Sequence, residues 1–226
     1  MPLQIIPFQY SINTAYIIKD KGAVLFDASY KGAAKSFSKL LSKSGIEPDE
    51  IKLIIISHGD FDHAGGAKEL QELTGAKIVM HEKDRENLEN SVFHWPEGVT
   101  PWGKFSRALL KPMLKKKVAF PPAKVNISVG DQGLSLKEYG IPGKIVYTPG
   151  HTYGSISIIL ESGEAFIGCM AHNRFPFVFR PGLPIYAKDI ELIKKSWKVV
   201  IDEGAQTIYP GHGKPFPLEK ILQYLN

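Results

Sequence analysis

The sequence predicts an α/β protein in which two mixed β-sheets pack face to face and helices cover their outer sides. β-rich runs and helical patterns alternate through both halves of the chain, which is typical of such a sandwich. Some runs, such as Lys52–Ile56, are uninterrupted and β-branched, as expected for buried strands. With 226 residues, 43% of them apolar, the chain can bury one sizeable core. We therefore treat 1–226 as a single domain.

The first half is expected to begin with strands and continue with alternating helices and strands. A helix is predicted over 33–44, because Phe37, Leu40 and Leu41 fall at helical spacing before Gly45. A turn at Asp20-Lys21-Gly22 separates the second and third strands. Further helices are expected at Ala64–Leu73 and Asp84–Leu88. The expected strands are Gln4–Phe8, Thr14–Ile18, Ala23–Asp27, Lys52–Ile56 and Lys77–Met80.

The second half repeats this mixture after a variable insert at about 90–124. One helix face is formed by Ile190, Ile193, Trp197 and Val200. The expected strands are Val125–Val129, Leu134–Leu136, Lys144–Thr148, Ser155–Leu160, Ala165–Ile167 and Gln206–Tyr209.

The insert carries an amphipathic helical pattern. Two residues turn an α-helix by about 200°, so an apolar stripe should face away from a basic stripe displaced by two residues. Pro112 should kink this helix. The segment 102–117 could cap an active site and grip an acyl chain, or lie on an anionic membrane surface. A helix docked by its apolar face, with solvated lysines outside, also explains the pattern. The apolar stripe is Trp102, Phe105, Leu109 and Met113, and the basic one is Lys104, Arg107, Lys111 and Lys115.

The net charge and the cysteine content exclude few classes of function. The net charge of +5 is mildly basic and permits attraction to anionic substrates or lipids. The single cysteine, Cys169, excludes an intrachain disulfide. Met1–Phe8 lacks the features of a secretory signal and the apolar runs are too short to span a bilayer, so we expect a cytoplasmic protein. No nucleic-acid module is evident, since the lysine run 115–117 is weak evidence.

Three polar clusters each follow a predicted strand. They are His58-Gly59-Asp60-Phe61-Asp62-His63, Thr148-Pro149-Gly150-His151-Thr152 and Pro210-Gly211-His212-Gly213. A single histidine after a strand is usually a surface or satisfied polar residue. Four donors in one loop, with two more glycine-flanked histidines, instead indicate a site for zinc, iron or manganese. The neighbouring glycines would let the backbone bend tightly and bring the ligands close.

These clusters resemble the motifs of the metallo-β-lactamase superfamily. The stretch 56–66 resembles its first histidine motif, H-x-H-x-D-H, while 148–155 and 209–213 are similar to its later histidine motifs. Asn13–Ile18 and Val24–Asp27 resemble the family's start. The resemblance covers nearly the whole chain except about 90–124. It implies a four-layer αβ/βα sandwich with metal ions at one edge.

Two positions depart from the family pattern. Asp60 stands where the second histidine is usual, and Cys169 where most hydrolases have a metal-bridging aspartate. Asp60 could still ligate, or could only accept hydrogen bonds beside a weak first site. Cys169 could be a terminal ligand, as in one β-lactamase subclass, or a small buried hydrophobe. The resemblance implies one metal on His58, Asp60 and His151. It implies a second on Asp62, His63 and His212, with Cys169 nearby.

The resemblance implies a metal-dependent hydrolase with one or two zinc ions, although the ligand types also suit iron or manganese. A metal-activated hydroxide would attack an ester, thioester, lactone or related carbonyl of a small-molecule substrate. Asp62 or Asp60 could orient the water and shuttle its proton. If Asp62, His63, Cys169 and His212 filled one site, the other would keep the open position for water.

Other residues have weaker assignments. Asp27 could hold a ligating imidazole or be an ordinary turn residue, and His172 could enter the pocket or lie in a loop. His81 and His94 match no ligand motif and are expected to be structural or exposed. Trp102 and Phe105 are candidates for substrate contact from the insert.

Three other functions fit the same residues. His58, Asp60 and His151 form the two-histidine, one-carboxylate set of non-haem iron oxidoreductases and dioxygenases. A phosphodiesterase would use a similar centre. The altered ligand positions also suit a metal-binding protein without turnover. The missing secretion signal and the altered first motif argue against β-lactamase activity itself.

Overall fold

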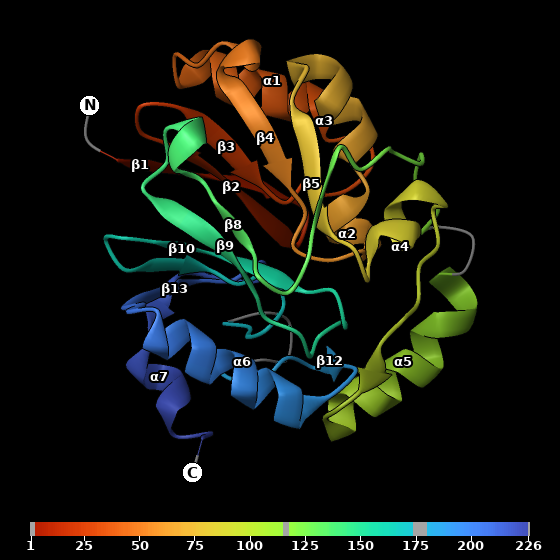
Figure 1. The fold of residues 1–226 in the computed structure, drawn as a ribbon. Helices are drawn as coiled ribbons and strands as arrows, with labels where there is room; N and C mark the ends of the chain where they lie inside the picture. The colour runs from red at the N-terminus through yellow and green to blue at the C-terminus, as the bar shows by residue number, and fades with distance from the viewer. Residues whose placement is uncertain (1–2, 115–117, 174–179, 226) are drawn as a thin grey trace.

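The N-terminal half of the chain forms one sheet of the sandwich. The computed structural model describes residues 3–114, 118–173 and 180–225 (Figure 1). In spatial order, this first sheet contains β1 Gln4–Tyr10, β2 Asn13–Lys19, β3 Ala23–Phe26, β4 Ile51–Ile55, β5 Lys77–His81 and β7 Ile127–Val129. Strands β3, β4, β5 and β7 run parallel, so their carboxyl ends lie at one edge of the sheet.

The C-terminal half forms the second sheet. Its strands, in spatial order, are β14 Phe216–Pro217, β13 Thr207–Tyr209, β11 Glu164–Phe166, β10 Ile156–Leu160, β9 Gly143–Tyr147 and β8 Leu134–Ser135. β11 and β13 are parallel, and β10 is antiparallel to both β9 and β11. Strands β9, β11 and β13 therefore all end at the same edge.

Helices cover the outer face of each sheet. On the first sheet lie α1 Ala34–Lys43 and α3 Ala67–Thr74, and on the second lie α6 Ile190–Asp202 and α7 Glu219–Leu222 (Figure 1). The remaining elements are the helices α2 Phe61–Ala64, α4 Arg85–Glu89 and α5 Pro101–Leu114, two 3₁₀ turns at Pro48–Glu50 and Lys137–Tyr139, and a ribbon of β6 Glu97–Gly98 with β12 Tyr186–Ala187.

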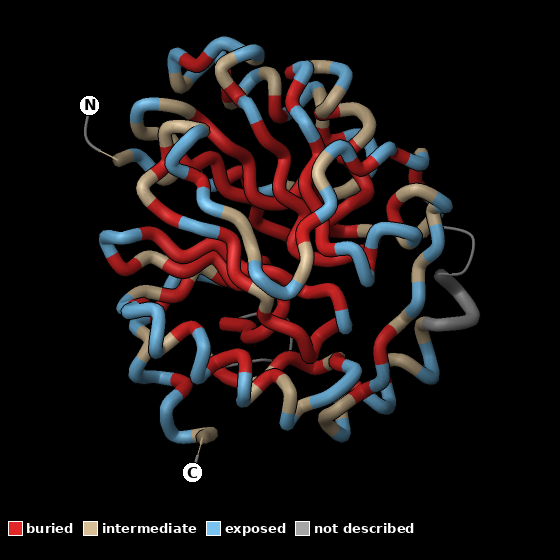
Figure 2. Tube along the Cα trace, in the orientation of Figure 1, coloured by how far each residue is buried: buried red, intermediate tan, exposed pale blue. Residues whose placement is uncertain are grey.

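Three apolar clusters fill the spaces between these four layers. Phe37 and Leu41 of α1 pack with the first sheet, Phe26 and Phe166 lie in the cluster between the sheets, and Trp197 of α6 packs with the second sheet. Figure 2 shows the buried residues concentrated along the central strands. The predicted αβ/βα sandwich is confirmed.

Two predicted elements end differently from expectation. The strand predicted to reach Asp27 stops at Phe26, because Asp27 turns the backbone with φ 66°. The helix predicted over Ala64–Leu73 is divided between α2 and α3 at Gly65-Gly66. There the backbone pairs with the loop after β3, through Ala28 N to His63 O at 2.7 Å and Gly66 N to Ser29 O at 3.0 Å.

The insert forms α5, but the expectation that the apolar stripe packs against the protein is wrong for two of its members. Phe105 and Leu109 are 60% and 56% exposed. Gly103 sets the rotation of the helix, because a Cβ there would lie 2.1 Å from the carbonyl oxygen of Ile185. This close approach turns Trp102 and Ser106 inward instead.

Some sequence-based assignments fall on residues that the structure does not describe. The lysine run 115–117 lies outside the described residues, as do the side chains of 111–114. Among the helices of the described chain, none has the length and apolar character needed to cross a membrane.

Candidate metal centre

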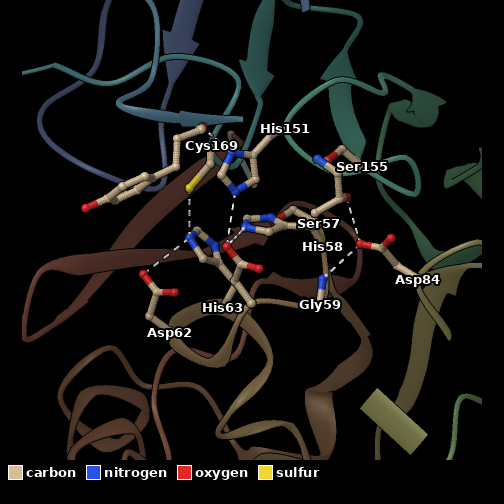
Figure 3. Close-up of polar contacts among 12 residues, drawn as sticks. Ser57, His58, Gly59, Asp62, His63, Asp84, His151, Ser155 and Cys169 are labelled. Carbon is tan, nitrogen blue, oxygen red and sulfur yellow. Dashed lines mark hydrogen bonds and ion pairs between the residues drawn. The ribbon is translucent and has the colours of Figure 1, made fainter. Parts of the chain in front are cut away.

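Seven candidate ligands meet where the two sheets share an edge. His58 and Asp60 follow β4, while Asp62 and His63 lie on α2. The second sheet brings its ligands, of which Figure 3 shows His151 and Cys169, at the carboxyl ends of β9, β11 and β13. These are His151, Cys169 and His212. The four imidazoles and the thiol are at most 5% exposed.

The six imidazole and carboxylate ligands fall into two sets. In the first, Asp60 Oδ2 lies 3.5 Å from His58 Nε2 and 3.2 Å from His151 Nε2. In the second, Asp62 Oδ2 lies 3.2 Å from His212 Nε2 and 3.7 Å from His63 Nε2. Each set contains two imidazoles and one carboxylate, in the grouping that the family resemblance implies.

Cys169 lies between the two sets. Its Sγ is 3.1 Å from His63 Nε2. The sulfur groups with His58 and His151, and equally with His63 and His212, with all ligand atoms of each group within 4.8 Å of one another. The thiol is thus shared by the two sets, whereas the resemblance implied proximity to the second alone.

Each imidazole is held through Nδ1 by the protein, which leaves Nε2 facing the centre. Nδ1 of His151 donates to the carbonyl of Tyr186 at 2.9 Å, and Nδ1 of His212 to that of Ile12 at 2.8 Å. A carbonyl only accepts, so both rings carry a proton on Nδ1, and in the neutral ring the lone pair is at Nε2. His63 Nδ1 pairs with Asp27 at 2.7 Å. Fixing Nδ1 in this way orients a histidine for metal binding through Nε2.

The centre has the features of a cation site. Nε2 of His58 is buried and lacks a hydrogen-bond partner among the described residues, since the Asp60 oxygen at 3.5 Å is too distant for a good bond. The Nε2 atoms of His63 and His212 face each other at 3.3 Å. Imidazole, carboxylate and thiolate are the ligands that zinc prefers, so the residues present fit a metal ion.

Opposite charges in the centre shift the pKa values of its members. Burial opposes protonation of His58, but the negative Cys169 and Asp60 outweigh it and raise its pKa to about 10. Burial likewise opposes protonation of His212, and Cys169 with Asp62 raises its pKa to about 10. For Cys169, burial favours the thiol, yet the surrounding imidazoles hold its pKa well below the usual value. The pKa values of both aspartates are lowered despite burial.

Two residues outside the ligand set hold its loops together. Asp27, fully buried, accepts from Ser57 N at 2.8 Å and contacts His63, which is the placement expected of a residue behind a ligating imidazole. Sequence reasoning missed Asp84. Its carboxylate accepts from Gly59 N at 3.1 Å and from Thr152 Oγ1 at 2.7 Å, joining the first and second ligand loops (Figure 3).

Glycines permit two of the close approaches. A Cβ on Gly211 would lie 2.5 Å from Cε1 of His63. Gly168, with φ 53°, precedes Cys169, and a Cβ there would lie 2.6 Å from the Ser57 hydroxyl. That hydroxyl is 2.8 Å from Nδ1 of His58. The sequence predicted that glycines beside the ligand histidines would permit close approaches of the backbone. This prediction is confirmed at Gly211. Gly168 was not among the predicted glycines.

A cavity of about 300 Å³ opens onto the centre. Asp60, Asp62, His151, Cys169 and His212 line one end of it. Its other walls include Phe61, Phe93, Trp95, Trp102, Leu110 and Ile185.

The remaining sequence-predicted residues divide between the cavity and the rest of the molecule. His172 is buried in the wall, 5.0 Å between ring centroids from His212, and burial lowers its pKa to about 4. The expectation for Phe105 is wrong, because the rotation of α5 leaves it on the outer face. His94 is exposed, and His81 is buried against Tyr147, so neither joins the centre.

Comparison with known proteins gives a consistent assignment. A family model described as the metallo-beta-lactamase superfamily matches residues 9–212. A probable metallo-hydrolase of Methanocaldococcus jannaschii is 29% identical over 219 residues, covering 95% of this chain and 93% of that one. A hydroxyacylglutathione hydrolase of Pelagibacter ubique is 27% identical over 153 residues, covering 68% of this chain and 48% of that one.

Solved structures share the fold. The BLEG-1 B3 metallo-beta-lactamase superposes with a TM-score of 0.71 at 20% identity, covering 100% of both chains. A metallo-beta-lactamase family protein from Thermus thermophilus gives a TM-score of 0.68 at 19% identity, covering 99% of this chain and 77% of that one.

Proposed function

Because the chain belongs to the metallo-β-lactamase superfamily and is a metal-dependent hydrolase of that family, we propose that it hydrolyses esters, thioesters or lactones with zinc as the metal. The observation that carries this proposal is the arrangement of two imidazole–carboxylate sets around one thiol at the end of a cavity. Such a centre can activate water without a serine or cysteine nucleophile.

Two ions are proposed, one for each set. His58, Asp60 and His151 would hold the first, and the second set is Asp62, His63 and His212. Cys169 is available to both. When bound, a divalent ion lowers the pKa of water from about 15.7 to about 7 and polarises a carbonyl oxygen.

The chain's own residues supply the proton handling. Asp60 and Asp62 line the cavity at the reacting end, so either carboxylate can accept a proton from water and return it to a leaving group. Their lowered pKa values keep both carboxylates ionised at neutral pH, as ligands of a cation must be. The largely apolar walls lower the local polarity beside the centre, which strengthens electrostatic interactions there.

The test removes one set while leaving the other. Replacing Asp60 with alanine should reduce kcat/KM to background on an ester and lactone panel, while about one zinc ion per chain stays bound. Elemental analysis and initial rates measure the two effects. Asp131→Ala, which removes an exposed carboxylate beside Lys83, is the matched control and should keep both activity and metal.

Several outcomes would contradict the proposal. If Asp60→Ala retained turnover, the first ligand set would not be needed for catalysis. A wild-type protein loaded with two ions yet inactive on the whole panel would contradict hydrolysis of these carbonyl compounds. Iron in the purified protein, with oxygen consumption, would support an oxidoreductase instead.

A further inference from the structure

The cavity beside the centre has one polar end and one apolar end. Its wall beyond the ligands is a continuous series of aromatic contacts. Phe61 and Phe93 meet edge to face with ring centroids 5.0 Å apart, and Phe93 lies 5.8 Å from Trp95. Trp95 in turn meets Tyr186 edge to face at 5.7 Å. Because all four rings line the cavity, this wall runs from Phe61, next to Asp60, to Tyr186 on β12.

The polar atoms at the far end are already paired with each other. Ser106 Oγ lies 2.8 Å from the carbonyl of Trp102 and 2.6 Å from the Tyr186 hydroxyl. The serine can therefore donate to the carbonyl while it accepts from the tyrosine, and each hydroxyl proton has an acceptor. A ligand at this end meets hydroxyls that protein groups already satisfy.

No lysine or arginine lines the cavity among residues 3–110, 118–173 and 180–225, whose side chains the structure describes. Arg107, on the same helix as Trp102, is not among the residues that line the cavity, and its Nη2 lies 2.6 Å from Glu97 Oε1. An anionic group on the distant part of a substrate would thus be taken out of water without a partner, which is strongly unfavourable.

We propose that this cavity selects substrates whose acyl group is small, neutral and apolar, whether aliphatic or aromatic, and rejects acyl groups that carry a carboxylate. The inference rests on the proposed hydrolase function and adds the substrate class. A volume of about 300 Å³ lies at the lower end of small-molecule sites, which suits a short acyl chain or a single ring.

A matched pair of esters tests the selection. The p-nitrophenyl ester of hexanoic acid and the mono-p-nitrophenyl ester of adipic acid have the same six-carbon chain, but the second ends in a carboxylate. With the zinc-loaded protein we expect kcat/KM to be larger for the hexanoate by about 100-fold or more, given the cost of burying an unpaired charge. Equal values for the two esters would overturn the inference while leaving the hydrolase function intact.

Two variants on α5 test whether the cavity wall is responsible for the preference between the two esters. Trp102→Lys brings a cation to the cavity wall and should reduce the hexanoate preference by about tenfold or more. Phe105→Lys adds the same charge on the exposed face of the helix and should leave the preference unchanged. A preference that responds equally to both variants would contradict selection by the cavity.

A binding measurement that needs no turnover tests the substrate preference of the cavity separately from the proposed hydrolase function. Hexanamide and the monoamide of adipic acid are titrated into zinc-loaded wild-type protein, with the fluorescence of Trp95 and Trp102 as the signal and buried Trp197 as background. We expect tighter binding of hexanamide by about 100-fold. If neither ester is hydrolysed but this preference is found, the hydrolase proposal fails and the cavity assignment stands. Equal binding of the two amides overturns the cavity assignment.

Discussion

The two carboxylate oxygens of Asp27 hold the His63 imidazole against the backbone of Ser57. One carboxylate oxygen accepts from the backbone of Ser57, and the other lies 2.7 Å from His63 Nδ1. The residue adopts φ 66°, which is uncommon for a non-glycine residue, and this turn directs the carboxylate back behind the imidazole. A ligand-orienting role accounts for a buried aspartate in this backbone conformation.

Replacing Asp27 with asparagine should therefore weaken metal binding more than it weakens the fold. The amide oxygen can still accept from Ser57, but the amide nitrogen cannot accept from His63 Nδ1–H. We expect zinc affinity to fall about 10–100-fold, measured by competition with a chromophoric chelator. Asp202→Asn, an exposed change at the end of α6, should have no effect. If Asp27→Asn bound zinc with unchanged affinity, Asp27 would not orient His63 for metal binding.

Among single residues, the candidate ligands could be proposed from the sequence, but most of the groups that hold them could not. Histidines and aspartates in glycine-rich loops at strand ends have a recognisable pattern, so His58, His151 and His212 could be identified. Their Nδ1 partners include the backbone carbonyls of Tyr186 and Ile12, which carry no sequence signature. Cys169 could be placed near the centre, but its position between the two sets depends on the packing of both sheets.

At the scale of elements, the ligand loops are joined by side chains from other segments. Asp84, at the start of α4, accepts hydrogen bonds from Gly59, Thr152 and Gly154. The first of these lies after β4 of the first sheet and the others after β9 of the second. One carboxylate thus links the ends of two strands that belong to different sheets.

Asp84→Asn should loosen this link. At least one acceptor is replaced by a donor, so a buried N–H or O–H loses its partner, which costs about 1–3 kcal/mol. For a chain of this size we expect the melting temperature to fall by about 2–4 °C per kcal/mol, measured by calorimetry of the metal-free protein. Glu86→Gln, an exposed neighbour on α4, is the control. A melting temperature equal to that of the control would exclude a structural role for Asp84.

Long elements were predictable, and short or tightly packed ones were not. β-branched runs such as Ile51–Ile55 fix a strand because few other structures accommodate them. The two-residue strands β6 and β12 are too short to show any periodicity. The rotation of α5 depends on Gly103 approaching the backbone of Ile185, a contact that the spacing of apolar residues does not reveal.

At the scale of the whole molecule, the centre is an assembly of opposite charges that the two sheets bring together. Parallel strands place their carboxyl ends at a common edge in each sheet, and the sheets meet there through Ile156 N to Ser57 O at 2.9 Å and Thr14 N to Gly211 O at 2.8 Å. The order of layers followed from the alternation of strands and helices and from the family resemblance. The balance of charges in the folded centre could not be predicted from the sequence and is seen only in the structure.

That charge balance predicts proton release when metal binds. The pKa values of His58 and His212 are raised to about 10, so both imidazoles hold an extra proton at pH 7 in the metal-free protein. A metal ion binds neutral imidazole, so loading must displace these protons, and affinity should fall as the pH is lowered. Calorimetric titration with zinc in two buffers of different ionisation enthalpy measures the release. Identical heats in the two buffers would contradict it.

The most direct test of the whole account is the number of metal ions that the folded chain binds. Metal-free protein is titrated with zinc, and the bound metal is determined by elemental analysis after removal of the free ion. The two ligand sets predict saturation at about two ions per chain, and a reduction to about one in Asp60→Ala. A wild-type protein that retains no zinc under these conditions would contradict the assignment of this centre.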